Sequence, residues 1–141
     1  MRPKKVILYA SNNEQDLSTV GFMLKVHGYQ VLTAMGSAET IDLFTANCPD
    51  LVLVDFPIAQ ATVTIDRLKA IHPYVPLVLI GDPQPSPGWV SSADFILRRR
   101  GLTTAEFLDC IRAMSARKRG PRKGSPVAFR NMETARAART A

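Results

Sequence analysis

Several side chains that could take part in chemistry follow short aliphatic runs in this sequence. Asp55 ends the run LVLVD, Ser11 and Asn12 follow KVILYA, Gly81 ends LVLIG, and Arg98 follows DFIL. A carboxylate in such a place is a working reactive group, the remnant of one, or a polar residue where a buried strand meets solvent. A nearby arginine could hold the carboxylate in a bidentate ion pair. Whether these side chains lie close together therefore depends on the fold.

No other constellation in the sequence is typical of a catalytic site. The stretch after the first run, YASNNEQ, contains no glycine, which argues against a P-loop or a dinucleotide-binding turn. His27 and His72 lie at expected helix ends, and no Ser or Cys is placed with them as a nucleophile. Cys48 and Cys110 lack the spacing of a disulfide framework or a metal site. We therefore expect no enzyme and no metal centre of these kinds.

Short apolar runs alternate with segments of helical spacing. The predicted strands are Lys5–Ala10, Gln30–Ala34, Leu51–Asp55, Leu77–Gly81 and Asp94–Leu97. They are too short for helices and rich in β-branched residues, and three are continuously apolar, as in strands covered on both faces. The predicted helices lie within 13–28, 37–47, 62–73 and 102–119. This alternation predicts a doubly wound parallel sheet with its site at the carboxyl ends of the strands.

One connection departs from the alternation. Between Gly81 and Asp94, prolines at positions 83, 85 and 87 precede Gly88, so a full helix is not expected there. The fourth helix of the regular pattern is therefore predicted to be reduced or lost. Trp89 in this stretch is interpreted either as an exposed anchor or as a plug for the missing helix.

Positive charge is concentrated at the C-terminus. The formal net charge is +6, and from Arg117 onward eight basic residues accompany a single acid, Glu133. We expect one domain at 4–117 and a disordered basic tail at 118–141, which is a solvated terminus or binds nucleic acid or an acidic partner weakly. No apolar run approaches the roughly 20 residues of a membrane span. We therefore expect a cytoplasmic protein with no membrane contact.

The segments that carry these runs resemble the receiver domain of two-component response regulators. The similar phrases are KKVILYASNNEQDLSTVGFMLKVHGYQVLTA, PDLVLVDFP, VPLVLIGD and ADFILRR, and the resemblance covers roughly residues 4–117. It implies a flavodoxin-like (βα)5 fold with a five-stranded, doubly wound parallel sheet. It also implies a protein partner, either a histidine kinase or a downstream signalling protein. In that family an aspartate at the end of the third strand accepts a phosphoryl group, and Asp55 matches it.

The other signature positions of the family differ in this sequence. The two acidic residues that hold Mg²⁺ after the first strand are replaced by Ser11 and Asn12. The Ser or Thr that ends the fourth strand is replaced by Gly81, and the lysine that ends the fifth by Arg98. Because Mg²⁺ prefers anionic oxygen ligands, the loss of two carboxylates predicts that Mg²⁺ binds poorly and that no cofactor is held.

Three roles remain open for Asp55: a structural partner of Arg98 or of backbone amides, a residual phosphoacceptor, and an incidental polar residue. Asp82 and Glu14 lie nearby in the sequence and could in principle replace the lost metal ligands, although neither stands at a matching position. We expect an atypical single-domain receiver that acts by protein–protein interaction with little or no Mg²⁺-dependent phosphorylation. The alternative is a phosphorylatable single-domain regulator that accepts phosphate on Asp55.

Overall fold

The sheet has five parallel strands in the order β2-β1-β3-β4-β5. The computed structural model describes residues 4–81, 93–99 and 101–116. The strands are β1 (Val6–Ser11), β2 (Gln30–Ala34), β3 (Leu51–Asp55), β4 (Leu77–Ile80) and β5 (Phe95–Leu97). After β2 the chain crosses to the other side of β1, so the switch point of the sheet lies between β1 and β3. In doubly wound sheets ligands bind beyond the carboxyl ends of the strands at this point.

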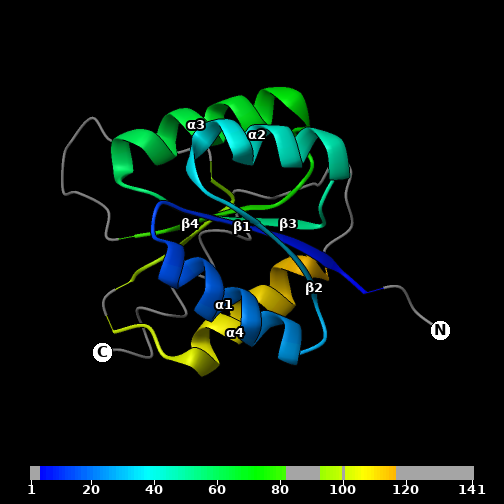
Figure 1. Cartoon of the computed structure of the whole chain (residues 1–141), viewed down its shortest axis with the longest axis vertical. Coiled ribbons are helices and arrows are strands. Elements are labelled where there is room, and N and C mark those ends of the chain that lie inside the picture. The colour runs from blue at the N-terminus through cyan, green and yellow to red at the C-terminus, as the bar shows by residue number, and fades with distance from the viewer. Residues whose placement is uncertain (1–3, 82–92, 100, 117–141) are drawn as a thin grey trace.

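Two helices cover each face of the sheet within the described residues. The helices are α1 (Glu14–Val26), α2 (Gly36–Asn47), α3 (Ile58–Ile71) and α4 (Thr104–Ser115). Figure 1 shows α2 and α3 on one side of the sheet and α1 and α4 on the other. The core is therefore divided into two layers, one between the sheet and each pair of helices.

Residue parity along the central strands decides which layer each side chain enters. Ile7 and Tyr9 of β1 and Leu53 of β3 pack in the layer of α1 and α4. The residues between them, such as Leu8 and Val54, pack in the layer of α2 and α3. This follows from the two-residue period of a strand. Side chains that continue the alternation of Ile7, Tyr9 and Leu53 beyond the strand ends therefore lie on the side of α1 and α4.

Local signals in the sequence explain where the helices begin and end. The Asn13 side chain accepts a hydrogen bond of 3.1 Å from the Asp16 N–H and caps α1. Thr103 and Glu106 form a capping box at the start of α4, which satisfies backbone N–H groups that lack a partner within the helix. The predicted helix-end positions of His27 and His72 are confirmed, because they are the C-caps of α1 and α3.

Most predicted elements are confirmed. The strands at 30–34 and 51–55 have the predicted bounds. The strand β1 is shifted by one residue towards the C-terminus, and β4 and β5 are each one residue shorter than predicted. Helix α3 begins at Ile58, four residues before the predicted segment, because Ala61 already packs fully buried against the sheet. The predicted loss of the fourth helix, the alternatives for Trp89 and the predicted basic tail concern residues 82–92 and 117–141, which lie outside the described residues.

Within the described part of the chain, none of the helices combines the length and the apolar character needed to span a membrane.

Candidate functional site

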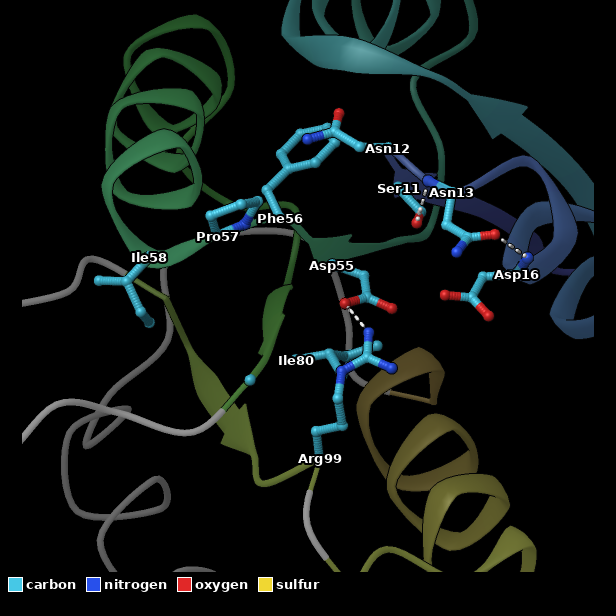
Figure 2. A pocket seen from close by; sticks show the side chains of 11 residues that line it. Ser11, Asn12, Asn13, Asp16, Asp55, Phe56, Pro57, Ile58, Ile80 and Arg99 are labelled. Carbon is cyan, nitrogen blue, oxygen red and sulfur yellow. Dashed lines mark hydrogen bonds and ion pairs between the residues drawn. The ribbon is translucent and has the colours of Figure 1, made fainter.

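Asp55 lies in a cleft beyond the carboxyl ends of β1, β3 and β4. Its register partner in β1 is Ser11, so the two strands end side by side. The cleft has a volume of about 520 Å³ and is shown in Figure 2. Its lining residues are Ser11, Asn12, Asn13, Asp16, Asp55, Phe56, Pro57, Ile58, Ile80, Gly81 and Arg99. The cleft therefore occupies the edge of the sheet where the sequence predicts the site.

Two side chains hold the two carboxylate oxygens of Asp55. The Tyr9 hydroxyl donates a hydrogen bond of 2.7 Å to Oδ2. A guanidinium nitrogen of Arg99 donates to Oδ1 in an ion pair, drawn in Figure 2. The Asp55 side chain is 8% exposed and that of Arg99 is 51% exposed. The carboxylate is therefore held between a buried phenol and a half-exposed cation.

The ion pair with Asp55 is made by Arg99 and not by the predicted Arg98. Side chains alternate between the faces of a sheet along a strand. Phe95 and Leu97 of β5 pack in the same layer as Leu53 of β3, so the alternation carries Arg99 to the side of Asp55. Arg98, one residue earlier, falls on the other parity and is exposed. The prediction of Arg98 rested on its position in the sequence alone. Position alone does not tell on which face of the sheet a side chain lies, so the neighbouring arginine was predicted.

The sequence does not predict the role of Tyr9 as a donor to Asp55, because Tyr9 lies within an apolar run. Its side chain is almost fully buried, with 1% exposure, and a buried tyrosine hydroxyl usually finds a hydrogen-bond partner. A signal was nevertheless present. In the segment VILYA, Tyr9 is the one residue whose side chain ends in a polar group. It precedes Ser11, the register partner of Asp55, by two residues, so both side chains lie on the same face of the sheet.

Both donors to Asp55 stay protonated at neutral pH. Burial raises the pKa of the Tyr9 phenol well above its ordinary value, and the charge of Asp55 and the hydrogen bond to it raise this pKa further. The hydrogen bond to Asp55 also raises the pKa of the Arg99 guanidinium. The phenol O–H and the guanidinium charge are therefore permanent features of the site.

A second carboxylate, that of Asp16 in the first turn of α1, reaches the same cleft. Figure 2 shows it pointing towards the pair formed by Asp55 and Arg99. Its negative charge is a further cause of the raised pKa values, after burial for Tyr9 and the Asp55 hydrogen bond for Arg99. In the sequence Asp16 was interpreted only as an acidic residue of a first helical turn, because its neighbourhood depends on how α1 crosses the sheet.

The two predicted degenerate positions at the end of β1 are engaged in local contacts. Ser11 is 2% exposed, and its hydroxyl accepts a hydrogen bond of 3.1 Å from the Asn13 N–H. The Asn12 amide donates to the Gln60 side chain of α3 over 2.8 Å, and Gln60 in turn donates to the Ser37 hydroxyl over 3.1 Å. Figure 2 shows the Asn12 side chain directed away from Asp55. Asn12 therefore ties the loop after β1 to α3.

The remaining predicted positions are distributed differently. Gly81 lines the cleft as expected, and its N–H donates to the Leu97 carbonyl over 3.0 Å. Glu14 lines a separate groove between α1 and β2, and Asp82 lies outside the described residues. Across 4–81, 93–99 and 101–116, no three His, Cys, Asp or Glu side chains gather into a group that could hold a metal ion.

Solved structures share this arrangement of strands and helices. A response regulator receiver domain protein from Clostridium thermocellum aligns with a TM-score of 0.70 and 24% sequence identity, over 79% of this chain and 94% of that chain. This chain has the receiver fold. The predicted flavodoxin-like, five-stranded parallel sheet is thereby confirmed.

Two further proteins share the receiver fold with this chain. The non-phosphorylated HemR receiver domain from Leptospira biflexa aligns with a TM-score of 0.68 and 18% identity, over 84% of this chain and 100% of that chain. The response regulator TrrA from Thermotoga maritima, solved in complex with Mg²⁺ and BeF, aligns with a TM-score of 0.68 and 18% identity, over 78% of this chain and 98% of that chain. No protein-family model and no curated protein matches the sequence.

Proposed function

We propose that this chain is an atypical receiver module of bacterial two-component signalling, which acts through contacts with a partner protein and takes up little or no phosphate. The receiver fold supports the assignment to this class of signalling module. The partner would be a histidine kinase or a downstream signalling protein, as the resemblance of the sequence implies. The part of the proposal that concerns phosphate rests on the surroundings of Asp55.

The observation that carries the proposal is that both oxygens of Asp55 are hydrogen-bonded within the protein. Oδ2 accepts from the Tyr9 hydroxyl and Oδ1 from Arg99. Phosphoryl transfer depends on positioning the reacting groups and on neutralising their charge. An oxygen of Asp55 that attacks phosphorus must give up or weaken one of these charge-assisted hydrogen bonds, which are stronger than neutral ones. The two donors therefore oppose attack by Asp55.

The same contacts oppose Mg²⁺ in the cleft. Magnesium demands near-octahedral oxygen ligands and gives up its water reluctantly. Asp55 is bound by two donors, and the Ser11 hydroxyl already accepts from the Asn13 N–H. The guanidinium of Arg99 lies against Asp55 and repels a second cation there. We infer that the cleft binds Mg²⁺ weakly, and no step of the proposed function depends on the ion.

Partner binding could act on the site through Arg99. Arg99 lines the main cleft and also a second hollow of about 240 Å³, which Thr104 and Phe107 of α4 border. The Leu102 N–H donates to the Arg99 carbonyl over 3.3 Å, so the arginine belongs to the turn that leads into α4. A partner that contacts this turn and draws Arg99 outward would remove the cation from Asp55. Partner affinity and the ion pair would then be coupled.

The alternative function is a regulator that is phosphorylated on Asp55. It is favoured by the open cleft in front of Asp55 and by Asp16, which brings a second carboxylate to that cleft. In that case Arg99 would release Oδ1 and pair with the oxygens of the phosphoryl group, for which its planar head is well suited.

Incubation with Mg²⁺ and acetyl phosphate, followed by intact-mass spectrometry, separates the two functions. For the proposed function we expect no phosphoprotein that depends on Asp55. A stoichiometric phosphoprotein that disappears in Asp55→Asn would overturn it and establish the alternative.

The reason proposed for weak or absent phosphorylation can be tested on the same protein. We expect the double variant Tyr9→Phe, Arg99→Gln to bind Mg²⁺ more tightly than the wild type in calorimetric titrations, because it removes both donors from Asp55. Arg98→Gln serves as the matched control, since it removes an exposed arginine next to the site. Equal Mg²⁺ affinities in all three proteins would mean that the donors do not limit metal binding.

A further inference from the structure

A groove runs along the outer side of α1, away from the Asp55 cleft. It has a volume of about 630 Å³ and lies between one face of α1 and the residues Thr33 and Met35 at the end of β2. Figure 1 shows α1 beside β2, which is an edge strand of the sheet. The groove therefore opens at a border of the fold where another chain could approach.

Apolar side chains are exposed along this groove. Phe22 is 71% exposed and Met35 is 43% exposed, and both line the groove. Val26, one helical turn after Phe22, is 64% exposed. Scattered single apolar residues are normal on a surface, but a contiguous group of large ones indicates an interaction site.

Four residues of α1 that line the groove are arranged symmetrically along the helix. Glu14, Ser18, Gly21 and Lys25 follow at steps of four, three and four residues, so they share one face of the helix. This spacing is the same in both directions. An acid stands at one end of the row, a base at the other, and two small residues in the middle. The row is therefore complementary to a copy of itself that runs in the opposite direction.

We propose that the groove is a dimerisation surface, in which the α1 helices of two copies of this chain pack antiparallel about a twofold axis. The axis passes between Thr19 and Val20. It places Glu14 of each copy opposite Lys25 of the other, and Ser18 opposite Gly21. The proposal is independent of the function proposed for Asp55, since none of these residues lines the Asp55 cleft.

The same axis also pairs the apolar residues. Leu17, which lines the groove, comes opposite Phe22 of the other copy. Isologous contacts of this kind require each patch to complement itself, and this requirement is met by charge and by apolar character. Gly21 is buried against Thr33 of β2 and lies with Leu17 on the floor of the groove, which the exposed Phe22 of the other copy would reach. A second copy is therefore the occupant that the charges of the groove favour.

Sedimentation velocity over a concentration series up to about 1 mM tests the proposal. Ion pairs at an exposed surface contribute little each, so we expect a weak dimer whose fraction rises with concentration. Glu14→Lys and Lys25→Glu should each weaken the dimer by about tenfold, because each places like charges opposite one another twice. The double variant Glu14→Lys, Lys25→Glu should restore dimerisation, and so should an equimolar mixture of the two single variants.

Matched controls are available on other surfaces. Lys4→Glu and Asp42→Lys reverse exposed charges outside the groove and should leave the dimer unchanged. Circular dichroism confirms that each variant is folded, and Phe22→Ala, at a mostly exposed position, weakens the dimer without any change in charge. A wild type that stays monomeric throughout would overturn the proposal and leave the groove to a partner of another sequence. A mixture of the single variants that fails to associate would overturn it as well.

Discussion

The Tyr9 hydroxyl and the Asp55 carboxylate connect the two central strands of the sheet. The two residues are 46 positions apart in the sequence, and the hydrogen bond between them is 2.7 Å long. It joins β1 to β3 beside the register pair of Ser11 and Asp55, where both strands end. Because the phenol is buried and the acceptor is charged, this hydrogen bond both stabilises the fold and fixes one oxygen of the candidate site.

Removal of the Tyr9 hydroxyl should destabilise the protein. We expect Tyr9→Phe to lower the free energy of unfolding by about 1–3 kcal/mol, the usual range for a hydrogen bond to a charged group or for an unpaired buried one. Urea denaturation measures this change. Tyr74→Phe is the matched control, because Tyr74 is 41% exposed. Equal losses in the two variants would contradict the role assigned to Tyr9.

Alkaline pH should weaken the same interaction. An unfolded tyrosine ionises near pH 10, whereas burial and Asp55 raise the pKa of Tyr9 in the folded state. The folded state binds this proton more tightly, so its contribution is fully present below about pH 10 and is lost as the pH rises towards the folded pKa. We expect the stability of the wild type to fall more steeply above about pH 10 than that of Tyr9→Phe.

Urea unfolding at a series of pH values measures the two slopes. The absorbance of tyrosinate provides an independent signal. In the wild type, the contribution of Tyr9 to this absorbance should appear only when the protein unfolds. A Tyr9 phenol that ionises in the folded protein near its ordinary pKa would contradict the prediction.

The two adjacent arginines should differ in their coupling to Asp55. In double-mutant cycles with Asp55→Asn, we expect Arg99→Gln to show a coupling free energy of about 0.2–1 kcal/mol, the range for an ion pair with a half-exposed partner. Arg98→Gln should show a coupling close to zero. Urea denaturation of the single and double variants supplies both cycles. The opposite order would mean that Arg98 is the partner, as the sequence first suggested.

A partly buried pair of hydroxyl groups should stabilise the contact between α2 and α3. The oxygen atoms of Ser37 and Thr64 are 2.8 Å apart, and the Thr64 hydroxyl donates to the Gln60 carbonyl over 2.8 Å, so Ser37 is the donor to Thr64. Thr64 is 1% exposed. We therefore expect Thr64→Val to lower the free energy of unfolding by about 0.5–1.5 kcal/mol.

Thr45→Val is the matched control for this change. Thr45 also donates to the carbonyl four residues earlier, over 2.8 Å, but it is exposed. Its substitution should change stability by less than that of Thr64 in the same urea measurements. A Thr64→Val variant as stable as Thr45→Val would show that the hydroxyl pair contributes nothing.

The order of the elements and the place of the site were predictable because their signals are local. The apolar run Leu51–Asp55 reads as a buried strand, and Asn13 and Thr103 stand where helices begin. The alternation of such segments implies a parallel sheet, and in that architecture the carboxyl ends of the strands meet at one edge. These signals therefore led to Asp55 and to a doubly wound parallel sheet, and the resemblance of the sequence to receiver domains implied the receiver fold.

The partners of Asp55 were decided only by the tertiary structure. Tyr9 and Arg99 are 46 and 44 positions away from Asp55 in the sequence, and no local pattern relates residues at such separations. Their contact depends on the face to which each strand directs its side chains, since a shift of one residue moves a side chain to the opposite face. That shift is what separates Arg99, which binds Asp55, from Arg98, which does not share its face.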